Sequence, residues 1–202
     1  MVEFIKRFKW WLFALILLGS LITYYERWRG HREHSQDAVI AAAAARYGLD
    51  AALIKAVVWR ESWFNPNARG TSGELGLMQL RQAAADEWAG AEHLLWFTHA
   101  QLLDPAKNTL AGTWYLRKQL RRFPQADNPI PYALAAYNAG PTHAQRWSKG
   151  AAATNSAAFL RQIDFPGTKD YVLTIMRRQE RYRRDFPARN LKRENSPSPS
   201  KA

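Results

Sequence analysis

The sequence predicts an all-α fold, and three observations support this class. No stretch alternates apolar and polar residues over several positions with a hairpin turn at its end, so no strands are expected. Apolar residues recur at helical spacing, for example within residues 51–58. Start and stop signals such as Asp104-Pro105 and Gly140-Pro141 separate the segments. A single compact helical domain therefore fits a chain of 202 residues of which 47% are hydrophobic.

Residues 1–26 differ from the rest of the chain and predict an N-terminal membrane anchor. Basic residues precede an uncharged run, residues 10–25, whose ends carry the paired tryptophans and tyrosines typical of membrane interfaces. Because this run is slightly shorter than the roughly 17–25 residues of a spanning helix, a signal sequence and a helix buried in the domain are alternatives. Residues 27–34 are polar and predict a linker, in which His31 and His34 are too few ligands for a metal site.

Residues 35–186 are expected to form the folded domain. Capping residues, glycines and prolines mark the ends of its predicted helices. These helices cover residues 37–47, 50–64, 76–88, 92–102, 105–123, 132–139, 156–163 and 168–184. The remaining residues, 187–202, are polar and rich in proline and serine, which predicts a disordered tail.

Composition restricts the classes of function. The net charge of +12 indicates an acidic partner, which is a nucleic acid, an anionic membrane or an acidic polymer. No nucleic-acid-binding motif is present and the arginines concentrate late in the chain, so no nucleic acid partner is expected. The absence of cysteine excludes thiol catalysis and disulfides. No His-Glu-x-x-His pattern or glycine-rich phosphate loop occurs, so neither a metal nor a cofactor is expected.

Glu61 is the leading catalytic candidate. It lies four residues after Val57 and three after Val58, so it continues the inward face of the 50–64 helix, which Pro66 brings to an end. The negative end of the helix dipole and apolar surroundings both disfavour the carboxylate and raise its pKa. A carboxylic acid that is protonated near neutral pH can act as a general acid. The alternative is an ordinary exposed glutamate in the last turn of a helix.

Three segments occur in an informative order. They are Glu61-Ser62-Trp63-Phe64-Asn65-Pro66, Gly76-Leu77-Met78-Gln79-Leu80 and Ala135-Ala136-Tyr137-Asn138-Ala139-Gly140. Together they resemble the lytic transglycosylases of the soluble-transglycosylase type, which are relatives of goose-type lysozyme, and residues 163–172 resemble the closing motif of that family. The resemblance covers residues 35–176 and implies a compact lysozyme-like helical domain.

The resemblance implies cleavage of the β-1,4 bond between N-acetylmuramic acid and N-acetylglucosamine in peptidoglycan, with formation of 1,6-anhydromuramoyl ends. By this analogy Glu61 protonates the glycosidic oxygen and then, as a carboxylate, takes the proton from the muramoyl O6 hydroxyl. The resemblance also implies a set of substrate-binding and supporting residues, among which the Tyr171 hydroxyl reaches Glu61. This set comprises Ser62, Gly76, Met78, Gln79, Tyr137, Asn138 and Tyr171. Two positions depart from the family pattern: Arg81 replaces an apolar groove residue, and Gly70 replaces a loop serine.

Two other functions are consistent with the sequence. A lysozyme-like hydrolytic muramidase would use Glu61 with a second carboxylate, for which Glu74 is the first candidate and Asp86 and Glu87 are others. A membrane-anchored module that binds the cell wall without catalysis is the second alternative. Because peptidoglycan lies outside the bacterial inner membrane, we expect a single-pass protein with its domain on the periplasmic or external side. Its expected partners are peptidoglycan glycan strands and the membrane, through residues 10–25, and cell-wall machinery proteins are further candidates.

Overall fold

The computed structural model describes residues 2–185, and within that range it describes the side chains of all residues except 2–9, 12, 14 and 185. The predicted tail, residues 187–202, lies outside the described residues. The chain divides into two compact units, Met1–Gln36 and Asp37–Ala202.

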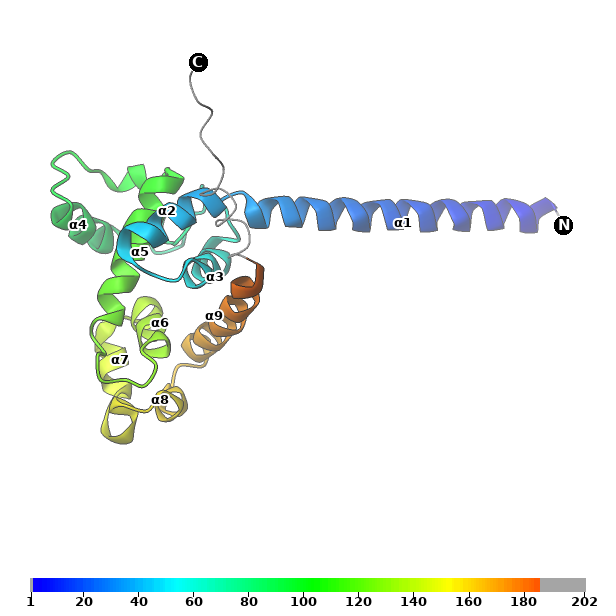
Figure 1. The fold of residues 1–202 in the computed structure, drawn as a ribbon. Coiled ribbons are helices and arrows are strands. Elements are labelled where there is room, and N and C mark those ends of the chain that lie inside the picture. Colours follow the sequence, from blue (N-terminus) through cyan, green and yellow to red (C-terminus); the bar gives the residue numbers. More distant parts are fainter. Residues whose placement is uncertain (1, 186–202) are drawn as a thin grey trace, which may run out of the picture. The chain divides into compact units, whose positions relative to one another are not determined.

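The first unit contains one long helix, α1 (Val2–His34), shown in blue in Figure 1. This helix continues without a break through residues 27–34, where the sequence predicts a linker. The described apolar side chains of its middle portion are exposed, with Leu15 64% and Ile16 60% accessible to solvent. In the part of the chain that the structure describes, no helix combines the length and the apolar character needed to cross a membrane.

The second unit confirms the predicted all-α class. Between residues 37 and 185 its only β-type pairings are isolated bridges, which join Leu75 to Arg69 and to Leu80. Its α-helices are α2 (Asp37–Tyr47), α3 (Ala51–Ser62), α4 (Gln82–Ala91), α5 (Pro105–Leu120), α6 (Ile130–Ala139), α7 (Pro141–Trp147), α8 (Ser156–Gln162) and α9 (Pro166–Asp185). Two short 3₁₀ helices, η1 (His99–Leu103) and η2 (Gly150–Ala153), complete it.

Capping side chains fix the starts of three helices where the sequence predicts them. The Asp50 carboxylate accepts a hydrogen bond from the Ala52 amide at the start of α3. Asp104 accepts one from the Lys107 amide at the start of α5, and Asn155 does the same for α8. Each cap satisfies an amide of the first turn that has no partner within the helix.

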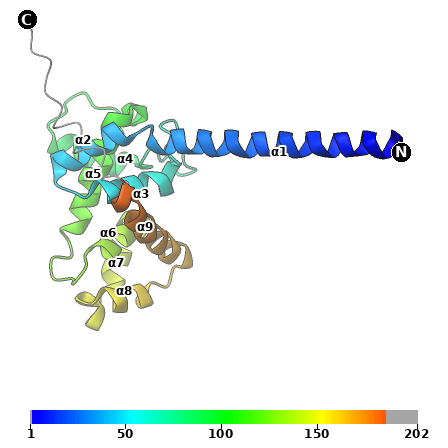
Figure 2. The ribbon, with the colours of Figure 1, turned by 45° about the vertical axis from the view of Figure 1, so that its right-hand side comes forward.

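Helix α3 is largely buried within the unit and carries Glu61 in its last turn. Residues 52–58 of α3 are buried, and α9 packs along it, as Figures 1 and 2 both show. The main core cluster combines α3 with α6 and α9, for example through Val58, Tyr132 and Ile175. A smaller cluster packs beneath the turn at residues 75–80 and includes Trp88 and Leu102. Burial of each large apolar side chain contributes about 1.5–3 kcal/mol.

The prediction of a helix that begins at residue 76 is wrong. Residues 76–80 form a tight turn, and α4 begins only at Gln82. The turn is closed by reciprocal backbone hydrogen bonds between Leu75 and Leu80, and both Gly76 and Gln79 adopt positive φ angles, 76° and 46°. A helix cannot include positive φ values, so the helix propensity of this stretch is overridden by its tertiary contacts.

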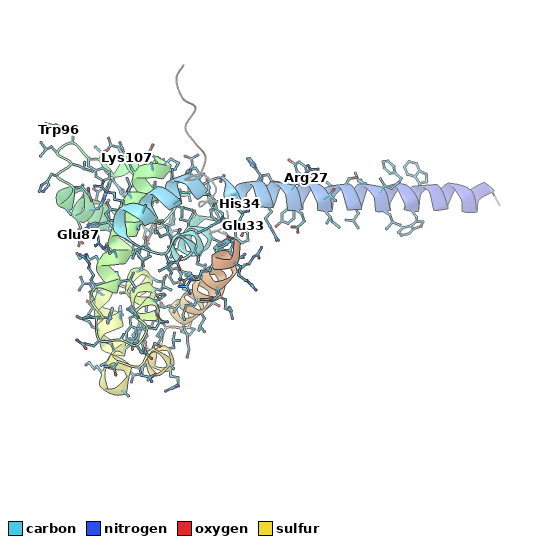
Figure 3. All side chains as sticks on the ribbon, in the orientation of Figure 1. Arg27, Glu33, His34, Glu87, Trp96 and Lys107 are labelled. Carbon is cyan, nitrogen blue, oxygen red and sulfur yellow. The ribbon has the colours of Figure 1, made fainter. Side chains whose placement is uncertain are left out.

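Two further helix predictions need correction. Residues 92–98 form an irregular loop, and only His99–Leu103 is helical, because Phe97 packs edge-on against Trp88 while Trp96 is 89% exposed at the outer end of the loop (Figure 3). Residues 141–147, for which the sequence predicts no helix, form α7, and Pro141 opens it because proline fits the first turn of a helix.

Candidate active site

The Glu61 side chain enters a cleft from the last turn of α3. The helix ends at Ser62, where Trp63 adopts a left-handed conformation (φ 52°) and its amide bonds the Trp59 carbonyl. This end comes before the position where Pro66 would stop the helix. The cleft has a volume of about 360 Å³. Its lining residues are Glu61, Glu74, Gln79, Leu80, Arg81, Ala84, Tyr115 and residues 137–140.

The surroundings of Glu61 favour its protonated form. Burial raises the pKa of the Glu61 carboxyl from its ordinary value of 4.5 to about 7, and the negative charge of Glu74 adds to this effect. A hydrogen bond from the Tyr171 hydroxyl to Glu61 Oε1, 2.6 Å long, and the positive charge of Arg60 act in the opposite direction. The shift has the direction predicted from the sequence, and burial is its main cause. At neutral pH both protonation states of Glu61 are therefore populated.

Two tyrosines from different helices, the buried Tyr171 and the partly buried Tyr137, lie close to this carboxyl group. Tyr171 of α9 donates to Glu61, whereas Tyr137 of α6 donates to the Met78 carbonyl at 2.8 Å and packs edge-on against Tyr115. Burial and the charge of Glu61 hold the pKa values of both hydroxyls well above their ordinary range. Both tyrosines therefore remain hydrogen-bond donors at neutral pH.

The turn at residues 75–80 is held in place by Asn108, a buried residue of α5 that sequence reasoning missed. Its Oδ1 accepts from the Met78 amide, and its Nδ2 donates to the carbonyls of Leu75 and Leu102, each at 2.8 Å. A side chain at Gly76 would collide with Asn108, so the glycine serves close packing inside the protein. A polar residue on the inward face of α5 was the signal that could have identified Asn108.

A second glycine of α5 makes room for the same turn. A side chain at Gly112 would collide with the side chain of Met78, which is fully buried beneath the cleft. Gly112 lies four residues after Asn108, so both residues face the turn from one side of α5. The pair forms one contact surface for the turn and explains why a glycine occupies a helix interior.

The remaining predicted residues make specific contacts around the cleft. The Ser62 hydroxyl bonds the Leu77 carbonyl (2.8 Å), which ties the end of α3 to the turn. The Gln79 side-chain amide donates to the carbonyls of Gly76 and Ala68. Asn138 is exposed, and its Oδ1 accepts from the Thr168 hydroxyl at 2.8 Å.

The structure brings the predicted residues together in two layers. Glu61, Gln79, Tyr137 and Asn138 line the cleft. The second layer lies outside this lining: Gly76, Met78 and Tyr171 are hydrogen-bonded to lining residues, and Ser62 bonds the Leu77 carbonyl in the turn. Segments separated by more than 100 residues in sequence thus converge on one carboxyl group.

Glu74 is the only other carboxylate that lines the cleft among the residues described. Its Oε1 accepts from Arg81 Nε at 2.7 Å, and its Oε2 accepts from the Ser72 amide at 2.9 Å. Although burial opposes it, these hydrogen bonds, together with one from its own amide, hold the pKa of Glu74 below its ordinary range. Asp86 and Glu87 do not line the cleft and bond to Gln82 and Lys118 respectively. Within residues 2–185, no group of three potential metal ligands is close enough to hold an ion.

Comparisons with known proteins give a consistent result. Residues 38–160 match the family described as the transglycosylase SLT domain. The chain is 36% identical over 108 residues to membrane-bound lytic murein transglycosylase F of Desulfosudis oleivorans, a match that covers 52% of this chain and 22% of that protein. It is 32% identical over 130 residues to the soluble lytic murein transglycosylase of Escherichia coli K12, covering 63% of this chain and 20% of the relative. These matches thus span only about a fifth of the length of either relative.

The solved structures agree with this result. An inactive glutamate-to-glutamine mutant of the lytic transglycosylase Slt from Pseudomonas aeruginosa superposes with a TM-score of 0.67 at 29% sequence identity. The match covers 75% of this chain and 24% of that protein. The fold around the cleft is therefore that of a lytic transglycosylase domain.

Proposed function

This chain belongs to the transglycosylase SLT domain family, and on that premise we propose that it is a peptidoglycan lytic transglycosylase. The proposed reaction cleaves the β-1,4 bond between N-acetylmuramic acid and N-acetylglucosamine and forms a 1,6-anhydromuramoyl end. The observation that carries the proposal is the position of Glu61: a half-buried carboxyl with a pKa of about 7, in a cleft, bonded by Tyr171.

In the proposed first step, protonated Glu61 gives its proton to the glycosidic oxygen while the bond to the anomeric carbon breaks. The electron pair of that bond stays with the departing N-acetylglucosamine, which leaves as an alcohol. Glu61 is now a carboxylate, and the Tyr171 hydroxyl stabilises it by the hydrogen bond already present. A pKa near 7 suits this role because the group must be a competent acid before the step and a competent base after it.

In the proposed second step, the muramoyl O6 hydroxyl attacks the anomeric carbon and Glu61 removes its proton. The product is the 1,6-anhydro ring, and Glu61 returns to its protonated state, so that no water is consumed. Gln79 and Asn138 line the cleft with amide groups that can bind sugar hydroxyl or N-acetyl groups. In this proposal, the shape of the turn at residues 75–80 is maintained by Ser62, Gly76, Met78 and Tyr137.

The hydrolytic alternative receives less support from the cleft. A muramidase of that type needs a second carboxylate that activates water or attacks the sugar. Glu74 is the only candidate in the described lining, and both of its oxygens already accept hydrogen bonds, one of them from a guanidinium group. The non-catalytic alternative does not account for the half-buried Glu61, because desolvation of its carboxylate destabilises the fold near neutral pH.

Location is a further part of the proposal. Because its proposed substrate lies outside the inner membrane, we place the domain on the periplasmic or external side of a bacterial cell. Some relatives are named membrane-bound and others soluble. The exposed apolar side chains within residues 10–25 are the surface we assign to membrane contact. We expect protease added to intact spheroplasts to digest the domain. Protection of the domain from the protease would contradict this placement.

The proposed reaction is tested by the ends of the products. Purified protein incubated with peptidoglycan sacculi should release muropeptides that end in 1,6-anhydromuramic acid, each lighter by one water than the hydrolysed species. Mass spectrometry of the released fragments distinguishes the two. Reducing muramic acid ends as the main product would instead support the hydrolytic alternative.

A further inference from the structure

Two positions that depart from the family pattern, Gly70 and Arg81, both contact Glu74. A side chain at residue 70 would collide with Glu74 Oε2, so the glycine leaves the space that this carboxylate occupies. The other oxygen, Oε1, accepts from Arg81 Nε at 2.7 Å. The backbone closes the same unit, because the Gly70 amide donates to the Glu74 carbonyl at 2.8 Å. These three residues therefore form one connected group, of which Glu74 and Arg81 line the cleft.

The guanidinium group of Arg81 is only partly engaged by hydrogen bonds within the described residues. Glu74 engages only the Nε of Arg81, and no hydrogen bond to either Nη group is made by the residues between 2 and 185. The Arg81 side chain is 65% exposed, whereas Glu74 is 18% exposed, so the carboxylate acts as a support and the guanidinium faces outward. Both residues line the cleft that contains Glu61.

The Nη groups of Arg81 determine which kind of ligand this part of the cleft can bind. Two parallel N–H groups of a guanidinium match the two oxygens of a carboxylate, and such paired hydrogen bonds are stronger than neutral ones. The sugars of an N-acetylated glycan strand carry no charge of their own when peptide is attached to the lactoyl group of muramic acid. The carboxylates of such a substrate are therefore those of its peptides.

We propose that Arg81, oriented by Glu74, binds a carboxylate of the peptide carried by muramic acid and so makes the protein selective for peptide-bearing strands. The inference rests on the proposed function and names the substrate class of the same cleft. The overall charge of +12 favours approach of an anionic strand, and Arg81 supplies a fixed contact within the cleft.

The test compares two synthetic glycan strands that differ only in charge. One carries peptides with free carboxylates, and in the other these groups are primary amides. The parent protein should cleave the first with a kcat/KM about tenfold higher, which corresponds to one strong charged contact of roughly 1.4 kcal/mol. Arg81→Gln should bring the ratio of the two values close to one, and Arg81→Lys should retain part of it, since an ammonium cannot pair with both oxygens.

Two variants make the test specific. Gly70→Ala should lower the same ratio, because its methyl group displaces the Glu74 carboxylate that orients Arg81. Arg121→Gln makes the same chemical change at an exposed arginine that does not line the cleft, and it should keep the parental ratio. A parental ratio in Arg81→Gln, or a ratio near one in the parent with anhydro ends from both strands, would overturn this inference alone. Absence of anhydro ends from both strands would overturn the proposed function, and this inference with it.

Discussion

Replacement of Glu61 by glutamine is expected to lower the rate of formation of anhydromuramoyl ends by at least about 10³-fold. The amide preserves the size of the side chain and can still accept the hydrogen bond from Tyr171, but it cannot deliver or recover a proton. Because the cleft is otherwise unchanged, the variant protein should still bind the glycan strands of sacculi. The measurement is the release of anhydro products together with sedimentation of the protein with sacculi.

The same variant has a stability signature that separates a chemical loss from misfolding. Glu61 has a pKa of about 7 in the folded protein and about 4.5 when unfolded, so the parent loses stability as the pH rises from 4.5 through 7. Glutamine has no such titration. Glu61→Gln should therefore exceed the parent in free energy of unfolding above pH 7, by an amount on the order of 3 kcal/mol, and the gap should close as the pH falls.

A matched control is available on α4. Glu87 is an exposed glutamate that pairs with Lys118 and does not line the cleft. Glu87→Gln should change the rate by less than about twofold and the stability by less than about 0.5 kcal/mol. Retention of anhydro product formation in Glu61→Gln, with a correctly folded protein, would contradict the role assigned to Glu61.

The second large effect is expected on stability, from Asn108→Ala. This change leaves the buried Met78 amide and the Leu102 carbonyl without the hydrogen bonds that Asn108 makes, and it removes one of the two hydrogen bonds that the Leu75 carbonyl accepts. Each such group costs about 1–3 kcal/mol, so we expect the free energy of unfolding to fall by about 3–5 kcal/mol. Because the same turn carries Gln79 and the carbonyl that Tyr137 bonds, activity should fall even where the variant is still folded. Chemical denaturation at fixed pH measures the first quantity.

Asn67→Ala is the control for that experiment. Asn67 is exposed, and the hydrogen bond it makes is through its backbone amide. Its removal should change the free energy of unfolding by less than about 0.5 kcal/mol. If Asn108→Ala were equally mild, the turn at residues 75–80 would have to be held by packing alone, in conflict with the role of the three hydrogen bonds.

Much of the fold could be predicted from local signals. Helices α3, α5 and α8 begin where Asp50, Asp104 and Asn155 cap them, since a cap depends on a few neighbouring residues. The turn at residues 76–80 could not be predicted in this way. Its sequence favours a helix, and contacts from α5 impose positive φ angles that only the folded structure reveals.

For the candidate site too, some features could be predicted from the sequence and others required the structure. The position of Glu61 on the inward face of α3 and the direction of its pKa shift follow from helical periodicity and burial. The contribution of Asn108 required the structure, because it acts on backbone groups about 30 residues away. The connection between Gly70 and Arg81 could not be predicted from the sequence either. These two residues depart from the family pattern at separate positions, and only the structure shows that both contact Glu74.

The central claim is that one desolvated carboxyl group supplies both the acid and the base of the reaction. Nuclear magnetic resonance of protein labelled with ¹³C at the glutamate carboxyl, assigned by the Glu61→Gln spectrum, measures the titration of Glu61 directly. We predict a midpoint of about 7, coincident with the pH at which kcat/KM begins to fall. A midpoint near 4.5, the ordinary value for glutamate, would show that Glu61 is already ionised at neutral pH and would contradict the account.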